Sequence, residues 1–151
     1  MIGCAIEVHK ALGPGFARDL YANALNHALK TEGIEFSVDH GFDVRFGDHV
    51  VGQARADVYV GKRFLVKIMA DQRDVRAHER TELRAQLRAA DVELGLIINF
   101  GERRLKDGLV RVLNPDKLAA MRAEQEGDEE YEDDDEYEDD DEYEDDDEES
   151  E

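Results

Sequence analysis

Apolar residues recur at helical spacing at the start of the chain. Four of them lie three or four positions apart, at Ile2, Ala5, Val8 and Leu12. The sequence Gly-Pro-Gly at 13–15 should end this helix, because Gly13 suits a helix C-cap and Pro14 cannot continue the helix. A second helix is predicted over 16–33, where apolar positions again fall roughly on one face.

The middle of the chain changes to patterns typical of strands. Apolar and polar residues alternate over much of 34–46, and a second strand is predicted over 50–60. Residues 63–70 are apolar almost throughout, which is typical of a central, buried strand. Apolar residues at helical spacing then predict a helix over 75–90.

The rest of the chain supplies two more strands and a last helix. The strands are predicted over 92–100 and 109–113, with a loop at 101–108 between them. A helix over 114–124 is predicted to have Asn114 as its N-cap. Three adjacent strands favour antiparallel hairpins, and the helix after them favours a parallel crossover. We therefore expect an α/β (α+β-like) fold with a mixed sheet of five strands flanked by helices.

Charge divides the chain into two parts. The sequence has 39 acidic and 19 basic residues, but 22 of the acids and no Lys or Arg lie in 124–151. Residues 1–123 therefore carry 17 acids and 19 bases, so that the net charge of −20 becomes +2 in this part. The acidic segment repeats YEDDDE, and its like charges oppose compaction. We predict one folded domain at 1–123 and a disordered acidic tail of low complexity at 124–151.

The remaining composition points to a cytoplasmic protein. Cys4 is the only cysteine, so no internal disulfide can form and a reducing compartment is expected. No apolar run approaches ~18 residues, and the N-terminus lacks the pattern of a signal peptide, so no membrane partner is expected.

Several short stretches resemble one known family. They are IEVHKALGPG, Tyr21, RAD at 55–57, GLIINFG and LKDGLVRV, and together they run over about 2–112. In these stretches the chain resembles the GxxExxY family of the PD-(D/E)XK nuclease superfamily. The resemblance implies a restriction-endonuclease-like core and nucleic acid as the ligand. Where the family's residues are intact, it also implies Mg²⁺-dependent cleavage of phosphodiesters.

Only some of the functional residues of that family are present in this sequence. The resemblance places its glycine, tyrosine and strand aspartate on Gly15, Tyr21 and Asp57. Its other positions are degenerate here: Arg18 replaces a glutamate, Lys67 and Met69 replace a Glu-x-Lys pair, and Glu82 or Thr81 replaces a glutamine.

These replacements remove the chemistry of such a site. Mg²⁺ takes oxygen ligands from carboxylates and activates water. Lys67 puts a cation where an anion belongs, and Met69 neither binds Mg²⁺ well nor donates a proton. We therefore expect no cofactor and no functioning catalytic residue. We interpret Asp57 and Lys67 as a structural ion pair on neighbouring strands, with a residual phosphate or ligand site as the alternative for these two residues. A further alternative is a rearranged Mg²⁺ site made by Asp57, Asp71 and Glu82.

Basic residues form two candidate contacts for nucleic acid. They are Arg76, Arg80, Arg84 and Arg88 at i, i+4 spacing in a helix, and Arg103, Arg104 and Lys106 in a loop. We interpret the helical stripe first as the solvated face of an amphipathic helix, with contact to a phosphate backbone as the alternative. His78 is expected on the surface, and His9 is expected in packing or in a cap hydrogen bond.

Three functions follow from the sequence. The favoured one is a catalytically inactive GxxExxY-type domain that serves as a nucleic-acid-binding or interaction module, with a tail that solubilises it or regulates its binding. The first alternative is an active Mg²⁺-dependent nuclease that uses Asp57, Asp71 and Glu82. The second is a protein-interaction module that recruits a basic protein through the acidic tail.

Overall fold

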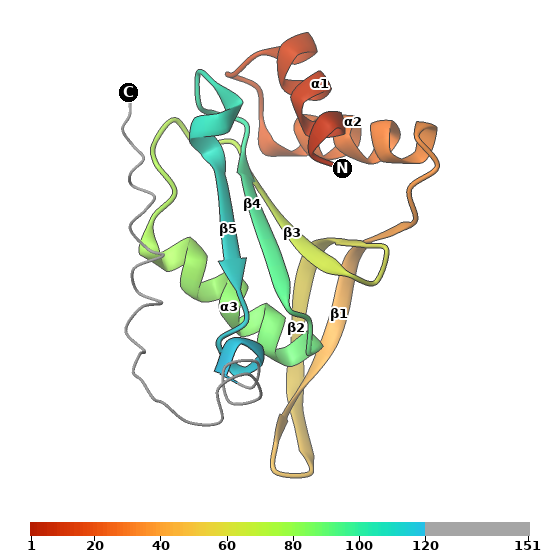
Figure 1. The fold of residues 1–151 in the computed structure, drawn as a ribbon, viewed down its shortest axis with the longest axis vertical. Coiled ribbons are helices and arrows are strands. Elements are labelled where there is room, and N and C mark those ends of the chain that lie inside the picture. The colour runs from red at the N-terminus through yellow and green to blue at the C-terminus, as the bar shows by residue number, and fades with distance from the viewer. Residues whose placement is uncertain (120–151) are drawn as a thin grey trace.

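The structure, a computed structural model, describes residues 1–119 and builds them from helices and one sheet (Figure 1). The helices are α1 (Ile2–Leu12), α2 (Arg18–Thr31), α3 (Ala77–Ala90) and the short 3₁₀ helix η1 (Leu105–Gly108). The strands are β1 (Phe36–Phe46), β2 (His49–Val60), β3 (Phe64–Met69), β4 (Leu94–Asn99) and β5 (Leu109–Leu113). Every predicted helix and strand within these residues is present, with ends one or two residues shorter in most cases.

The five strands form one mixed sheet in the order β1-β2-β3-β4-β5. The pairs β1–β2, β2–β3 and β4–β5 are antiparallel, whereas β3 and β4 are parallel. The parallel pair is the one that α3 connects, because a parallel neighbour requires a long crossover. The expected mixed sheet with β3 at its centre is confirmed.

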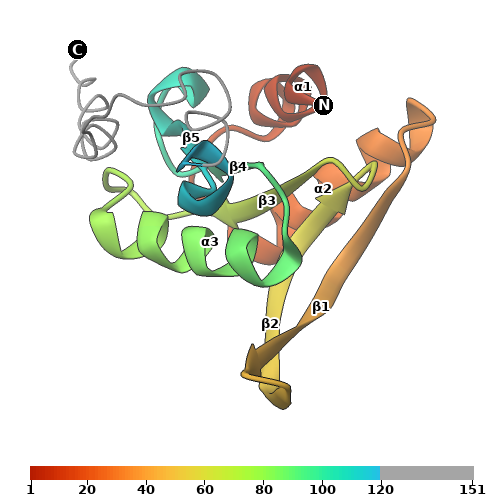
Figure 2. The ribbon, with the colours of Figure 1, turned by 60° about the horizontal axis from the view of Figure 1, so that its bottom comes forward.

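Helices cover both faces of the sheet (Figure 2). The helices α1 and α2 pack on one face through a core that includes Tyr21, Leu25 and Phe100, and the rings of Tyr21 and Phe100 stack with centroids 4.9 Å apart. The helix α3 packs on the other face through Leu83 and Leu87. These two cores account for the apolar periodicities of the sequence, because each helix has one buried stripe and β3 is buried on both faces.

Tyr21 also fixes the turn between the first two helices. Gly13 is the C-cap of α1 with φ 72°, and Gly15 has φ 117°, so both have backbone conformations that favour glycine. The hydroxyl of the buried Tyr21 donates to the carbonyl of Gly13 and accepts from the backbone N–H of Phe16 at 3.1 Å. Gly15 and Tyr21, which the resemblance singled out, therefore have a structural role in this turn.

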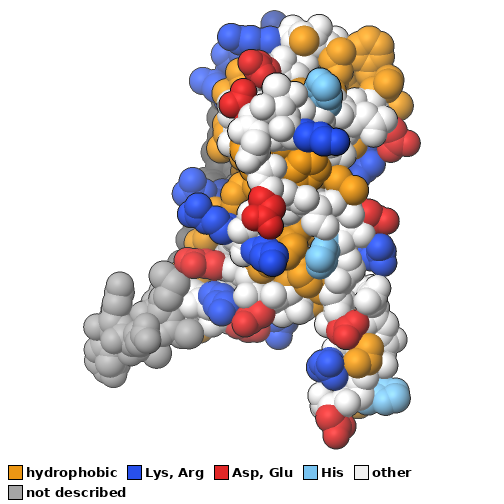
Figure 3. Space-filling view, turned by 90° about the vertical axis from the view of Figure 1, so that its right-hand side faces the viewer, with side chains coloured by type: hydrophobic (Ala, Val, Ile, Leu, Met, Phe, Trp, Pro, Cys, Tyr) orange, Lys and Arg blue, Asp and Glu red, His pale blue; other side chains and the backbone are white. Residues whose placement is uncertain are grey.

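The β1–β2 hairpin extends beyond the rest of the sheet (Figure 3, lower right). Since β2 pairs with β3 only over Val58–Val60, the outer part of the hairpin at 41–54 has no third strand beside it among the described residues. We call residues 41–54 the arm. Its tip is open to solvent, and it exposes apolar side chains beside Asp48 and His49, with Phe46 79% and Val51 59% exposed.

The described part ends in the first turn of another helix. Residues 115–119 are helical, and the side chain of Asn114 accepts the backbone N–H of Asp116 at 3.0 Å, which confirms the predicted N-cap. Asn114 also donates to the carbonyls of Leu87 and Val92 and so holds this helix against the end of α3. The rest of the predicted helix and the acidic segment 124–151 lie outside the described residues. Within residues 1–119, no helix is long and apolar enough to cross a membrane.

Candidate functional site

Four of the predicted site residues form two separate ion pairs, and the two helices that contribute to them pack on opposite faces of the sheet. In the first pair, Arg18 of α2 contacts Asp57 of β2, with 2.9 Å between Nη2 and Oδ1. Both side chains also hold the backbone of Ile68 in β3: Asp57 Oδ2 accepts its N–H at 2.7 Å, and Arg18 Nε donates to its carbonyl at 3.1 Å. Asp57 and Arg18 therefore extend the contact between β2 and β3 past the end of their backbone pairing.

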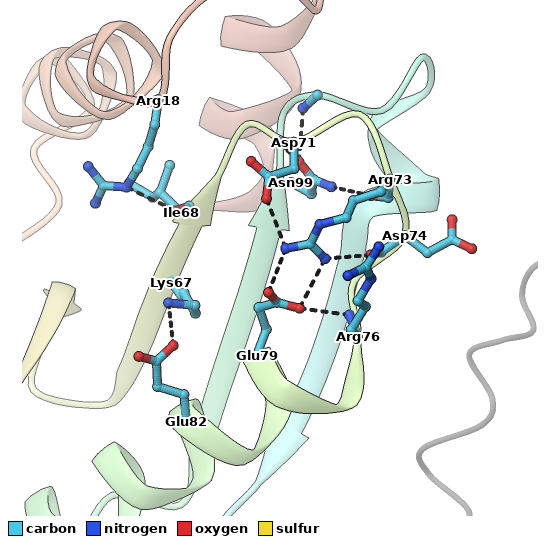
Figure 4. Close-up of polar contacts among 11 residues, drawn as sticks. Arg18, Lys67, Ile68, Asp71, Arg73, Asp74, Arg76, Glu79, Glu82 and Asn99 are labelled. Atoms are coloured by element: carbon cyan, nitrogen blue, oxygen red, sulfur yellow. Dashed lines mark hydrogen bonds and ion pairs between the residues drawn. The ribbon is translucent and has the colours of Figure 1, made fainter.

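The second pair joins Lys67 of β3 to Glu82 of α3 (Figure 4). The Nζ and Oε1 atoms are 2.9 Å apart, and the side chains are 19% and 48% exposed. Thr81 is exposed as well, but Glu82 is the residue that faces Lys67.

The predicted ion pair between Asp57 and Lys67 is therefore wrong. Lys67 shares the sheet face of Leu65 and Met69, which belong to the core under α3. Asp57 instead meets a helix that packs on the opposite face. The two residues lie on adjacent strands, but each finds its partner in a different helix, and those helices pack on opposite faces of the sheet.

A third group of charges lies in the segment that connects β3 to α3 (Figure 4). The guanidinium of Arg73 is 2.9 Å from Asp71 Oδ2 and 2.7 Å from Glu79 Oε2. Glu79 Oε1 also accepts the backbone N–H of Arg76 at 2.8 Å, so that the carboxylate caps the first turn of α3. These contacts organise the entry into α3.

Hydrogen bonds from Arg73 lower the pKa of Glu79 to about 2, against the opposing effect of burial. The same hydrogen bonds raise the pKa of Arg73. The Glu79 side chain is only 9% exposed, so its charge depends on these partners. Neither residue was among the predicted site residues; the available signal was a glutamate at the third position of α3, where it can reach back to the start of the helix.

Asn99 at the end of β4 was also missed, although it joins the two loops beside this group. Its fully buried side chain accepts the backbone N–H groups of Asp71 and Gly101, each at 3.0 Å. It donates to the carbonyl of Arg73 at 2.8 Å. One amide thus ties the segment after β3 to the segment after β4.

The residues of this region do not fit the magnesium ion that the fold implies. Within residues 1–119, no group of three or more His, Cys, Asp or Glu side chains is placed to hold a metal ion. The alternative set is not brought together either: Asp57 pairs with Arg18, Asp71 with Arg73, and Glu82 with Lys67. Met69 is buried in the core under α3. Each candidate carboxylate is therefore already paired with a basic side chain of the protein.

The predicted basic contacts lie at several places on the surface. Arg88 pairs with Asp116 and Arg104 with Asp107, and both arginines are exposed. Arg76, Arg103 and Lys106 are exposed as well. Figure 3 shows Lys and Arg side chains interspersed with acidic ones on the face that it presents. His78 is exposed, and His9 is buried with Nε2 2.8 Å from the carbonyl oxygen of Glu102, as expected for both.

Comparisons with known proteins agree with this architecture. The family model of the PD-(D/E)XK nuclease superfamily matches residues 1–112. No curated protein matches the sequence. The crystal structure of SSO0001 is similar with a TM-score of 0.50 at 17% identity, over 71% of this chain and 55% of that one. That likeness concerns the fold alone, and this chain spans just over half the length of the other. The family match covers most of the chain, which therefore belongs to the PD-(D/E)XK nuclease superfamily.

Proposed function

We propose that this protein is a GxxExxY-type domain that has lost metal-dependent nuclease activity and acts as a nucleic-acid-binding module. The observation that supports the loss of activity is the pairing of Asp57 with Arg18 and of Glu82 with Lys67. In each pair, the resemblance assigns the basic residue to a position where active relatives have an acid. The protein thus carries fixed cations at positions where a nuclease needs metal ligands.

Electrostatics opposes the entry of a divalent ion at either pair. Two unit charges 4 Å apart interact by about 4 kcal/mol at an effective dielectric near 20, and a divalent ion doubles that repulsion from a resident cation. A metal ion at Asp57 would have to displace Arg18, which also binds the backbone of Ile68. In this proposal, activity is lost because Arg18, which also holds the strands together, occupies the carboxylate of Asp57. The absence of one metal ligand is only part of the cause.

The first prediction is that the purified protein does not bind Mn²⁺ at a site that Asp57 controls and does not cleave DNA or RNA with Mg²⁺ or Mn²⁺. Isothermal titration calorimetry with Mn²⁺ should give the same trace for the wild type and for Asp57→Ala. A nuclease assay on single- and double-stranded substrates should show no cleavage above the background of a mock purification. Metal-dependent cleavage that Asp57→Ala abolishes would contradict the proposal and support the alternative of a rearranged active site.

Charge supports the second part of the proposal, in which the acidic segment regulates the binding of nucleic acid. Residues 1–123 have a net charge of +2, whereas 124–151 contain 22 acids and no Lys or Arg. Exposed bases at Arg76, Arg103 and Lys106 are available to phosphates. An acidic segment on the same chain competes with nucleic acid for such bases.

The second prediction concerns removal of residues 124–151. We expect the shortened chain to bind DNA or RNA more tightly than the full chain and with a steeper dependence on salt, because binding then releases counterions without competition. Fluorescence anisotropy with labelled oligonucleotides at several salt concentrations measures both quantities. A matched control is the same deletion with Arg103 and Lys106 changed to alanine, which should lose part of the gained affinity. Unchanged affinity together with loss of a basic protein partner would instead favour the interaction module.

A further inference from the structure

The arm has an open strand edge that fits a second copy of the same chain. Within residues 1–119, β1 is an outer strand of the sheet, and its far side has no partner strand. It is 11 residues long and contains neither Lys nor Pro, the residues that often protect such an edge. The N–H and C=O groups on this edge are therefore available for pairing (Figures 1 and 2).

Irregularities restrict pairing to one stretch of β1. Asp39 has φ 49°, and its side chain and carbonyl are bound by Arg55, so regular strand geometry begins after it. From His40 to Phe46, no residue of β1 has a positive φ. The bulge of the hairpin lies on β2, because Val44 pairs with Gly52 and Arg45 with Val50. A bulge twists a strand edge and disfavours further pairing, so the regular edge of β1 is the better site.

The side chains of this stretch are complementary to themselves in one antiparallel register. A two-fold axis at Val44 places Asp43 opposite Arg45 of the second copy, and Arg45 opposite its Asp43. The other face then pairs the exposed Phe46 of each copy with Phe42 of the other, on either side of the two Val44 residues. A two-fold axis at Asp43 would set two aspartates against each other, and one at Phe42 would require the distorted Asp39.

We propose that the protein forms a symmetric dimer through antiparallel pairing of the two β1 strands, centred on Val44. Each copy offers the same stretch, so the contact is isologous and closes with two copies. The pairing covers Phe46, which is 79% exposed at the tip of the arm. Few residues take part, so the dimer is weak and depends on protein concentration. The proposal does not depend on the loss of nuclease activity or on nucleic-acid binding.

Charge reversal in the full chain tests the dimer and its register. Sedimentation velocity over a concentration series should show a monomer–dimer equilibrium for the wild type. Arg45→Asp and Asp43→Arg each set like charges opposite one another, so each should weaken the dimer by about tenfold. The double variant D43R/R45D restores both opposite-charge pairs and should dimerise like the wild type.

Mixing the two single variants gives the sharpest outcome. In a mixed dimer, the two aspartates of Arg45→Asp lie opposite the two arginines of Asp43→Arg, so the mixture should dimerise more tightly than either variant alone. Lys62→Asp, an equal change of charge at an exposed turn, is the matched control and should leave the equilibrium unchanged. A wild type that stays monomeric at every concentration, or a dimer that is indifferent to Arg45→Asp, would overturn the proposal. Failure of the mixture or of the double variant to associate would overturn the register.

Discussion

Replacing Gly101 with alanine is expected to lower the free energy of unfolding by about 3 kcal/mol, the upper part of the range for overpacking. Gly101 follows β4 and lies directly against the segment after β3. An added Cβ would lie 2.6 Å from the backbone carbon of Asp71 and 2.8 Å from that of Ala70. Both are backbone atoms that no change of side-chain rotamer can move, so the two loops would have to separate. That movement also strains the hydrogen bond from the Gly101 N–H to Asn99.

Gly3→Ala is the matched control for this prediction. Gly3 lies in α1, and nothing lies within 4 Å of a Cβ at that position. The same chemical change should not lower stability there, because a Cβ meets no neighbour and alanine favours a helix over glycine. Urea denaturation followed by circular dichroism measures both variants. If Gly101→Ala unfolds at the same urea concentration as the wild type, the two loops do not approach as closely as described.

The second large effect is a loss of stability at acidic pH that depends on Glu79. The folded protein holds the pKa of Glu79 at about 2, below the ordinary value of 4.5. A depressed pKa contributes stability that is fully present above pH 4.5 and is lost as the pH falls toward 2. The difference of 2.5 units between these values corresponds to about 3 kcal/mol at 1.36 kcal/mol per unit. Glu79→Ala should therefore lose about 3 kcal/mol at neutral pH.

The pH dependence separates this ionic contribution from a mere loss of packing. Other carboxylates titrate in the same range, so the informative quantity is the difference in unfolding free energy between the wild type and Glu79→Ala at each pH. That difference should shrink as the pH falls from 4.5 toward 2. Glu93→Ala removes an exposed glutamate outside α3 and should give a small difference at every pH. A constant difference for Glu79→Ala would mean that its carboxylate is not ionically stabilised.

Local patterns in the sequence were sufficient to predict the fold, because each element follows a simple rule. Helical spacing marks α1, α2 and α3, and the continuous apolar run of β3 predicts its central place in the sheet. Asn114 is recognisable as a cap because an amide side chain precedes a proline at the start of a helical pattern. The 3₁₀ helix η1 was missed, since its four residues are too few to show a period.

The sequence identified several residues of the candidate site, but it did not show which of them pair with one another. Sequence spacing places Asp57 and Lys67 on neighbouring strands, but it does not show that each pairs with a residue of a helix instead of with the other. The partners that they find instead, Arg18 and Glu82, come from helices packed on those two faces. Asn99 carries no sequence signal of its own, because its role depends on two loops that meet only in the folded chain.

The parallel pairing of β3 and β4 has a consequence for how the protein is made. The β1–β2 hairpin joins strands that follow one another directly, so it can close as soon as both have left the ribosome. Phe64 of β3 cannot meet Leu94 of β4 until the whole of α3 has been synthesised. During that interval, a nascent chain holds β3, the most apolar strand, without its parallel neighbour and without the helix that covers it. Interruption of translation within α3 should therefore yield a species that requires a chaperone, whereas interruption after β5 should not.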